Sequence, residues 1–321
     1  MNTTPTTKTR PAAGRATALL VMVGVTLAWS GAFAALKFGL GSLSPGAALL
    51  LRFLPVWLIS GVYLLGRRRE LAALLRAAPV KVLAACTLGT AGYHMFLTFG
   101  LQGVTSAASS LIVACGSLFT YLISVSVKLE KPVARRFIGI LVALGGLFVV
   151  LRYGSGGEFD AGYLGYALLV VGAPLSWSSY TVLTKSILTD DKTGDINLLT
   201  AATFFFGSLP FFFFIDDTFW RAFTAPTTLL LVPGYLGLAA SLLGYLGWNW
   251  SLKRAHPSQV AAFLTLVPVL AHLWGYLFLG ETLTWMAALG GGLVLTGVTV
   301  VNLRKRRTRR TPAPADVEGT R

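Results

Sequence analysis

Charged residues are scarce in this chain, and acidic residues are the scarcest. Asp and Glu number 12 in 321 residues, and charged residues of both signs make up 12%, against about a quarter in soluble domains. No Asp or Glu lies well inside a long apolar stretch. The two cysteines, Cys86 and Cys115, fall in apolar stretches without a metal-ligand or disulfide spacing. These shortages argue against a soluble domain, a metal or cofactor site, and an enzyme built on paired acids.

Hydrophobic residues, at 55% of the chain, fill ten consecutive apolar stretches. Most stretches reach the ~20 residues that a helix needs to cross a bilayer, and none alternates as a barrel strand does. We therefore expect an all-α integral membrane protein with ten transmembrane helices. Their approximate bounds are 17–38, 44–65, 80–102, 105–127, 133–151, 162–184, 198–215, 228–252, 257–279 and 284–303.

The second half of the chain repeats the first. An offset of 151 residues pairs Glu130 with Glu281, Leu101 with Leu252, Gly139 with Gly290, and Gly146 with Gly297. An offset of 148 pairs Gly24, Trp29, Ser30 and Lys37 with Gly172, Trp177, Ser178 and Lys185. Five helices per half is an odd number, so the two repeats have opposite orientations in the membrane, as in many transporters. We predict repeats at 17–151 and 162–303, a linker at 152–161, and basic tails at 1–16 and 304–321.

The net charge of +15 reflects membrane orientation. Most of the 27 Lys and Arg residues fall on the cytoplasmic side if the N-terminus is cytoplasmic. This places both termini in the cytoplasm and the chain in a bacterial inner membrane. The basic residues are dispersed over short loops, and the C-terminal run RKRRTRR follows the last span directly. They favour anionic lipid headgroups at the cytoplasmic face over nucleic acid as a partner.

The two five-helix halves, the Trp-Ser pair in the first helix of each, and the Glu-then-Gly pattern resemble EamA-type members of the drug/metabolite transporter superfamily. The resemblance covers 17–303 and implies ten helices, a central cavity and transport of small metabolites, often outward. The family often carries a proline in the fourth helix of a half; Pro268 matches, whereas Ser117 stands at that place in the first half. The aromatic amino-acid exporter (YddG) branch is one member type that the chain resembles. Because substrates vary across the family, the resemblance predicts the class and leaves the ligand open.

Three ionisable residues lie deep within apolar stretches, away from the ends: Arg52, His94 and His272. Such residues usually face a cavity or a partner. For Arg52, anchoring to headgroups or carbonyls and contact with a substrate anion are equally favoured. For His94, a hydrogen bond to a neighbouring helix competes with a proton-carrying role, and for Asn249 an interhelical hydrogen bond competes with substrate contact.

Trp29 lies about 18 Å into its span, and Trp177 slightly more. Both are away from the interfacial aromatic belts, which favours a cavity wall over core packing. Thr265, Pro268, His272 and Tyr276 share one helical face, and Pro268 leaves a carbonyl without its helical donor. The full candidate substrate cavity comprises Trp29, Ser30, His94, Ser117, Tyr121, Trp177, Ser178, Asn249, Thr265, Pro268, His272 and Tyr276, with Arg52 as the candidate anion contact.

We therefore predict an exporter or facilitator of small amphipathic metabolites, such as amino acids, working by alternating access. The lack of acids at depth disfavours proton or sodium coupling, and a proton-coupled transporter is the first alternative. A channel is less favoured because no filter-like loop repeats. A membrane-embedded enzyme is less favoured because no catalytic set is visible.

Overall fold

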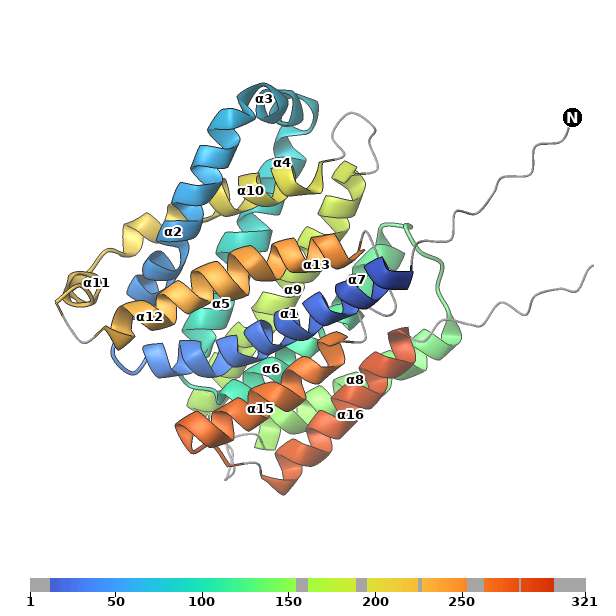
Figure 1. The fold of residues 1–321 in the computed structure, drawn as a ribbon. Helices are drawn as coiled ribbons and strands as arrows, with labels where there is room; N and C mark the ends of the chain where they lie inside the picture. Colours follow the sequence, from blue (N-terminus) through green and yellow to red (C-terminus); the bar gives the residue numbers. More distant parts are fainter. Residues whose placement is uncertain are drawn as a thin grey trace, which may run out of the picture.

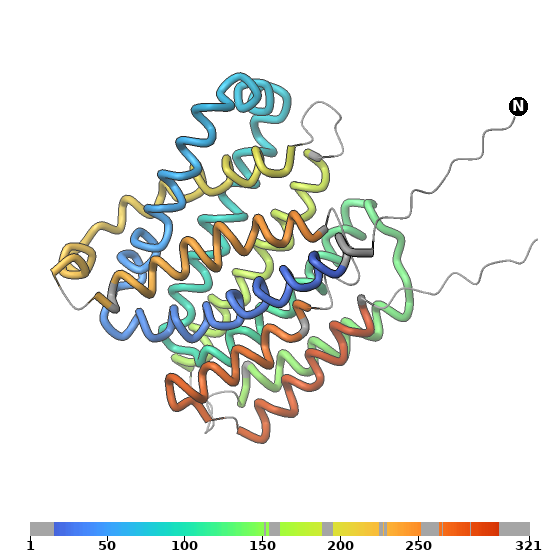
Figure 2. The backbone as a smooth tube through the Cα atoms, viewed as in Figure 1, coloured from blue at the N-terminus to red at the C-terminus, as the bar shows by residue number. Residues whose placement is uncertain are grey.

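The computed structural model describes residues 12–153, 161–188, 195–224, 227–252, 263–282 and 284–302. Every regular element in these ranges is a helix, and the described residues contain no strand (Figure 1). The remaining residues include most of the predicted tails and linker, which therefore lie outside the described part. The first described helix begins, and the last one ends, on the same side of the bundle (Figure 2).

Seven helical segments among the described residues are long and apolar enough to cross a membrane. They are Ala16–Gly39, Pro45–Gly66, Pro79–Gly100, Ser106–Ser126, Ala161–Ile187, Ile196–Phe214 and Leu230–Ser251. Three further apolar helices, α8 (Ala134–Tyr153), α15 (Leu266–Leu279) and α16 (Trp285–Asn302), lie at the other predicted positions. The prediction of an all-helical fold is confirmed for the described residues, and the length and composition of these seven helices point to an integral membrane protein.

Two of the spans contain a π-helical segment. One span runs from α4 (Pro79–Cys86) through η1 (Thr87–Gly92) to α5 (Tyr93–Gly100), and the other runs from α12 (Thr228–Gly234) through η3 (Tyr235–Leu243) to α13 (Gly244–Leu252). A π-helical turn departs from the regular i→i−4 ladder and is frequent at functional sites. Gly237 lets η3 pack directly on the backbone of α2 (Pro45–Gly66), because a Cβ there would collide with the Arg52 carbonyl.

The helices pack in reciprocal pairs. α1 (Ala12–Gly39) contacts α13 and α15, whereas α9 (Ala161–Leu188) contacts α5 and α7 (Gly116–Ser126). α2 contacts η3, and α10 (Ile196–Gly207) contacts η1. α8 lies along α16 (Figure 1). Glycines allow this last contact, since a Cβ at Gly146 would lie 2.6 Å from the Gly290 carbonyl oxygen.

Side-chain caps begin several helices. Ser44 accepts the Ala47 N–H at 3.0 Å and caps α2, and Thr105 accepts the Ala108 N–H at 3.1 Å and caps α6 (Ser106–Ala114). Asp195 caps α10, and Asp216 caps α11 (Asp217–Arg221). The remaining short elements are α3 (Arg68–Ala77), η2 (Leu209–Phe214) and η4 (Phe263–Thr265).

Candidate functional site

A buried arginine joins the two halves of the chain. Arg52 on α2 is 5% exposed, and its Nε and Nη2 donate to the Ser241 hydroxyl oxygen on η3 at 3.1 and 2.9 Å. The Ser241 hydroxyl donates onward to the Leu236 carbonyl at 2.9 Å. The guanidinium also lies over the Phe53 ring, 5.3 Å from its centroid. Among the described residues, no carboxylate forms an ion pair with Arg52.

Six aromatic side chains beside this arginine contact one another in a closed ring, which we call the circuit. Neighbouring ring centroids lie 4.7 to 6.2 Å apart, within the range of favourable aromatic contacts. In order, the circuit is Phe53, His94, Tyr93, Trp177, Tyr245 and Phe204, which returns to Phe53. Its members come from α2, α5, α9, α10 and α13, so both halves of the chain build the site.

The circuit follows the 151-residue offset of the sequence repeat. Phe53 and Phe204 are 151 residues apart, as are His94 and Tyr245. The contact of Phe53 with His94, at 4.7 Å, therefore corresponds to that of Phe204 with Tyr245, at 4.9 Å. The site lies where equivalent parts of the two halves meet.

The same offset relates the Arg52 contact to a neutral one. Thr203 is 151 residues after Arg52, and Ser241 is 151 residues after Thr90. In place of a charged pair, the Thr90 hydroxyl donates to the Thr203 carbonyl at 2.9 Å. The positive charge is thus confined to one of two equivalent places, which makes the site electrically asymmetric.

His94 supplies unsatisfied polar atoms next to the cation. Its side chain is 2% exposed, and neither ring nitrogen has a hydrogen-bond partner among the described residues. The Thr98 hydroxyl, one turn further along α5, is also buried and has no hydrogen-bond partner among the described residues. A buried polar group without a partner costs about 1–3 kcal/mol. Hydrogen bonds to a ligand would remove that cost.

The predicted tryptophans both lie at the site. Trp177 is part of the circuit. Trp29 contacts the Tyr245 ring at 6.2 Å, and its Nε1 donates to the Ala240 carbonyl in η3 at 2.8 Å. Trp29 therefore lines the cluster and also holds α1 to the π-helical segment.

Two of the three predicted serines join helices around the circuit. The Ser178 hydroxyl on α9 donates to the Gly116 carbonyl at 2.7 Å, and Ser30 on α1 accepts the Trp274 Nε1–H at 3.0 Å. The Ser117 hydroxyl is buried without a partner among the described residues.

The other predicted residues are not members of the circuit. The Tyr121 hydroxyl, in the middle of α7, accepts the N–H of Val133, which immediately precedes α8, at 2.8 Å. Asn249 donates to the Thr200 hydroxyl at 3.4 Å. On α15, Pro268 is buried, His272 is half-buried and Tyr276 is 60% exposed. Tyr276 therefore does not join the cluster. The Thr265 side chain lies outside the described residues.

The sequence prediction did not include five members of the site: Phe53, Tyr93, Phe204, Ser241 and Tyr245. The 151-residue offset contained a signal for two of them. It pairs Phe53 with Phe204, two identical residues at depth. The hydroxyl of Ser241 has no such signal, because a serine in an apolar run is common.

The two repeated glutamates serve structure at turns. Glu281 accepts the Ser106 N–H and hydroxyl, both at 2.7 Å, and thereby caps α6. Glu130 accepts from Arg136 at 2.5 Å. Both carboxylates therefore stabilise connections between helices.

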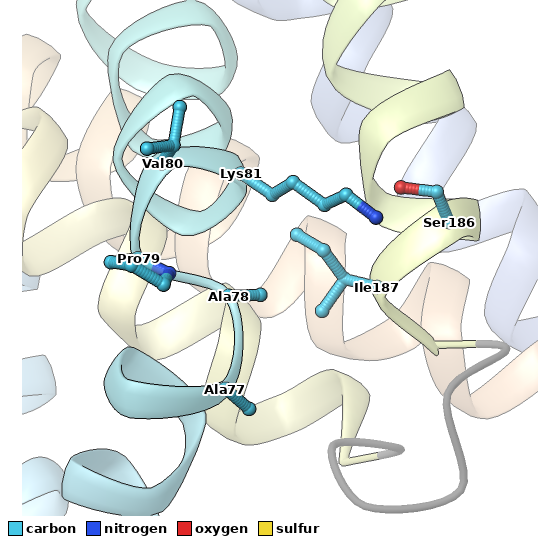
Figure 3. A pocket seen from close by; sticks show the side chains of 7 residues that line it. All are labelled: Ala77, Ala78, Pro79, Val80, Lys81, Ser186 and Ile187. Atoms are coloured by element: carbon cyan, nitrogen blue, oxygen red, sulfur yellow. The ribbon is translucent and has the colours of Figure 1, made fainter.

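One surface hollow lies at an end of the bundle, away from the circuit. Its volume is about 160 Å³, and it is lined by the α3–α4 junction and the end of α9. The Lys81 side chain extends toward Ser186 and Ile187 across it (Figure 3). It has no aromatic lining, so it does not compete with the circuit as a site for an amphipathic ligand.

Known proteins resemble this chain over nearly its whole length. An uncharacterized transporter of Archaeoglobus fulgidus is 31% identical over 279 residues, which cover 87% of this chain and 95% of that protein. The "Probable terminal-alkyne amino-acid exporter" of Streptantibioticus cattleyicolor is 28% identical, with 92% and 97% covered. The "Probable amino-acid metabolite efflux pump" of Salmonella typhimurium is 27% identical, with 91% and 96% covered.

A solved crystal structure supports the fold. It superposes with a TM-score of 0.59 at 20% identity and covers 91% of this chain and 99% of that chain. The model of the EamA-like transporter family matches residues 16–152 and again residues 164–303. The resemblance read from the sequence is confirmed: the chain belongs to the EamA-like transporter family and is a membrane transporter of small metabolites.

Proposed function

We propose that this transporter moves amphipathic metabolites that carry a carboxylate, with amino acids as the leading class, outward across a bacterial inner membrane. The observation that carries the proposal is Arg52, a buried guanidinium with no acidic partner among the described residues. A charge at membrane depth is costly and usually marks a substrate path. A substrate carboxylate would neutralise it, because the guanidinium fork matches a carboxylate in bidentate geometry.

The aromatic circuit suits the rest of such a ligand. Trp177 and Tyr245, with ring centroids 5.4 Å apart, offer faces that attract both apolar side chains and ammonium groups. Two of the relatives are named for amino acids or their metabolites. We therefore assign Arg52 to the carboxylate and the circuit to the amino group and side chain.

The packing supports an arrangement of ten helices in two inverted repeats, at 17–151 and 162–303. Helices α1 and α2 of the first half pack on helices of the second half, and their counterparts α9 and α10 pack on helices of the first half. The beginning of α1 and the end of α16 lie on one side of the bundle (Figure 2), as an even number of spans requires. Two inverted halves around one site provide alternating access. The distribution of Lys and Arg assigns that side to the cytoplasm, where anionic lipids are the expected partners.

Exchange in proteoliposomes tests the proposal. Vesicles holding the pure full chain and an unlabelled amino acid should accumulate the labelled amino acid transiently by counterflow. The matched control is the amine that lacks only the carboxyl group. Exchange of the amine at the same rate as the amino acid would refute the role given to the carboxylate, and dissipation without counterflow would indicate a channel.

A further inference from the structure

An apolar groove runs along the seam between α2 and α10. Its volume is about 380 Å³, and its lining includes Trp57, Gly61, Val62, Leu65 and Phe205. The Trp57 and Phe205 rings stack at 5.2 Å with planes 9° apart and form one wall. Gly61 leaves room for the Phe205 ring, because a Cβ there would lie 2.9 Å from that ring. The groove therefore depends on the residues that line this contact between α2 and α10.

The length of the groove matches one leaflet of a bilayer. From Trp57 to the end of α2 at Gly66 the helix rises about 14 Å, about half of the ~30 Å hydrocarbon thickness. The groove begins near the middle of the Pro45–Gly66 span and ends where that span ends. An occupant of this length and polarity is an acyl chain.

A free cation stands at the mouth of the groove. Arg68 begins α3 and lines the end of the groove. Its neighbour Arg67 is engaged by Glu70, Tyr63 and Asp195. Arg68, in contrast, is exposed and makes no hydrogen bond or ion pair with any residue that the structure describes. Its guanidinium can therefore bind a phosphate at headgroup depth.

α3 has the composition of a helix at the membrane surface. Leu74 is buried and Leu71 is half-buried, whereas Arg68, Arg69 and Arg76 are exposed. Basic residues at this depth attract anionic lipids. Figure 1 shows α3 lying across the end of α2, where the headgroups of that leaflet would lie.

We propose that the α2–α10 groove is a binding site for an anionic phospholipid, with the phosphate on Arg68 and one acyl chain between Val62 and the Trp57–Phe205 wall. The site rests on the membrane embedding of α2 and is independent of the transported substrate. Because the acyl chain contacts both α2 and α10, bound lipid stabilises the pair of helices that carries Phe53 and Phe204.

Lipid retention by the detergent-purified full chain tests the site. Native mass spectrometry would compare phosphatidylglycerol with phosphatidylcholine of identical acyl chains. The wild type should retain phosphatidylglycerol preferentially, and Arg68→Gln should reduce that preference about fivefold. Arg69→Gln, which removes the adjacent exposed arginine outside the groove lining, should keep it. An equal loss in both variants would show general attraction to a basic surface and overturn the proposal.

A second pair of variants tests the acyl chain. Val62 is 72% exposed and lines the groove, whereas Ile59 is 44% exposed on the same helix and does not line it. Val62→Trp should fill the groove and lower retention of both lipids, and Ile59→Trp should not. Unchanged retention in Val62→Trp would contradict the site. Because the readout is bound lipid, a failure here is distinct from a failure of the proposed transport activity, which counterflow measures.

Discussion

Arg52 and Ser241 are 189 residues apart in sequence and share two hydrogen bonds, of 3.1 and 2.9 Å, in a buried contact between α2 and η3. The equivalent contact between the halves, from Thr90 on η1 to Thr203 on α10, is neutral. The proposed transport site, at the junction of two similar halves, thus has a positive side and an uncharged side. This polarity would fix the orientation of a bound ligand that carries one carboxylate.

Removing the Ser241 hydroxyl should make the protein depend more on its ligand. In Ser241→Ala the buried guanidinium loses its hydrogen-bond acceptor, and bonds to a charged group contribute about 1.5–3 kcal/mol. The melting temperature without ligand should fall, and a carboxylate ligand should raise it more than in the wild type. Thr90→Val removes the neutral counterpart and serves as the control. An equal ligand response in both variants would argue against Arg52 as the carboxylate site.

Truncating Trp177 should impair transport more than it impairs folding. Trp177→Ala removes the ring that joins Tyr93 to Tyr245, so counterflow should be largely lost, and Trp177→Phe should keep part of it. In Trp29→Phe, the loss of the bond to Ala240 should lower stability by about 1 kcal/mol. Melting curves and counterflow on the same preparations separate the two effects. If the Trp177→Ala protein is unfolded, the Trp177 ring serves core packing and not ligand binding.

The Asp195 cap should make stability depend on acid pH. Burial raises the pKa of this carboxyl, but the N–H groups of Leu198 and Asn197 and the Arg67 guanidinium together outweigh it and hold the pKa below its ordinary value. The ionised form is therefore favoured in the folded state. Its contribution is present above the ordinary pKa of about 3.9 and is lost as the pH falls through the lowered folded-state value.

Two substitutions separate the contribution of the Asp195 cap to stability from that of its charge. Asp195→Ala removes both the cap and the ion pair and should lower stability at pH 7 by about 1 kcal/mol. Asp195→Asn keeps a capping oxygen, so it should cost less and should flatten the dependence of the melting temperature on pH below about 5. A pH profile of Asp195→Asn identical to that of the wild type would contradict the assignment.

Transport should run chiefly down the gradient of the substrate. No Asp or Glu lies well inside an apolar span of the sequence, so no intramembrane carboxylate is available to couple transport to protons, and His94 and His272 are the remaining candidates. With equal substrate on both sides, a pH gradient across proteoliposomes should produce little net accumulation. Strong accumulation that disappears in His94→Gln or His272→Gln would instead identify that histidine as the proton carrier.

The sequence predicted the site residues whose chemistry is unusual at membrane depth. Arg52, His94 and Trp177 are charged, titratable or bulky in apolar runs, and the structure brings all three to one cluster. Ser241 and Tyr245 were missed, because their roles depend on which face of η3 and α13 meets α2 and α9. Contacts between such distant segments are set by packing and leave no local pattern. The helical periodicity of α15 likewise could not show that Tyr276 is exposed.

The selectivity of Arg52→Gln in counterflow is the most direct test of the account. The wild type should exchange an amino acid much faster than the amine that lacks its carboxyl group. Arg52→Gln should lose most of that preference, whereas Arg221→Gln, which removes an exposed arginine on α11, should keep it. A well-folded Arg52→Gln protein that retains the full preference for the amino acid would contradict the claim that Arg52 binds the substrate carboxylate.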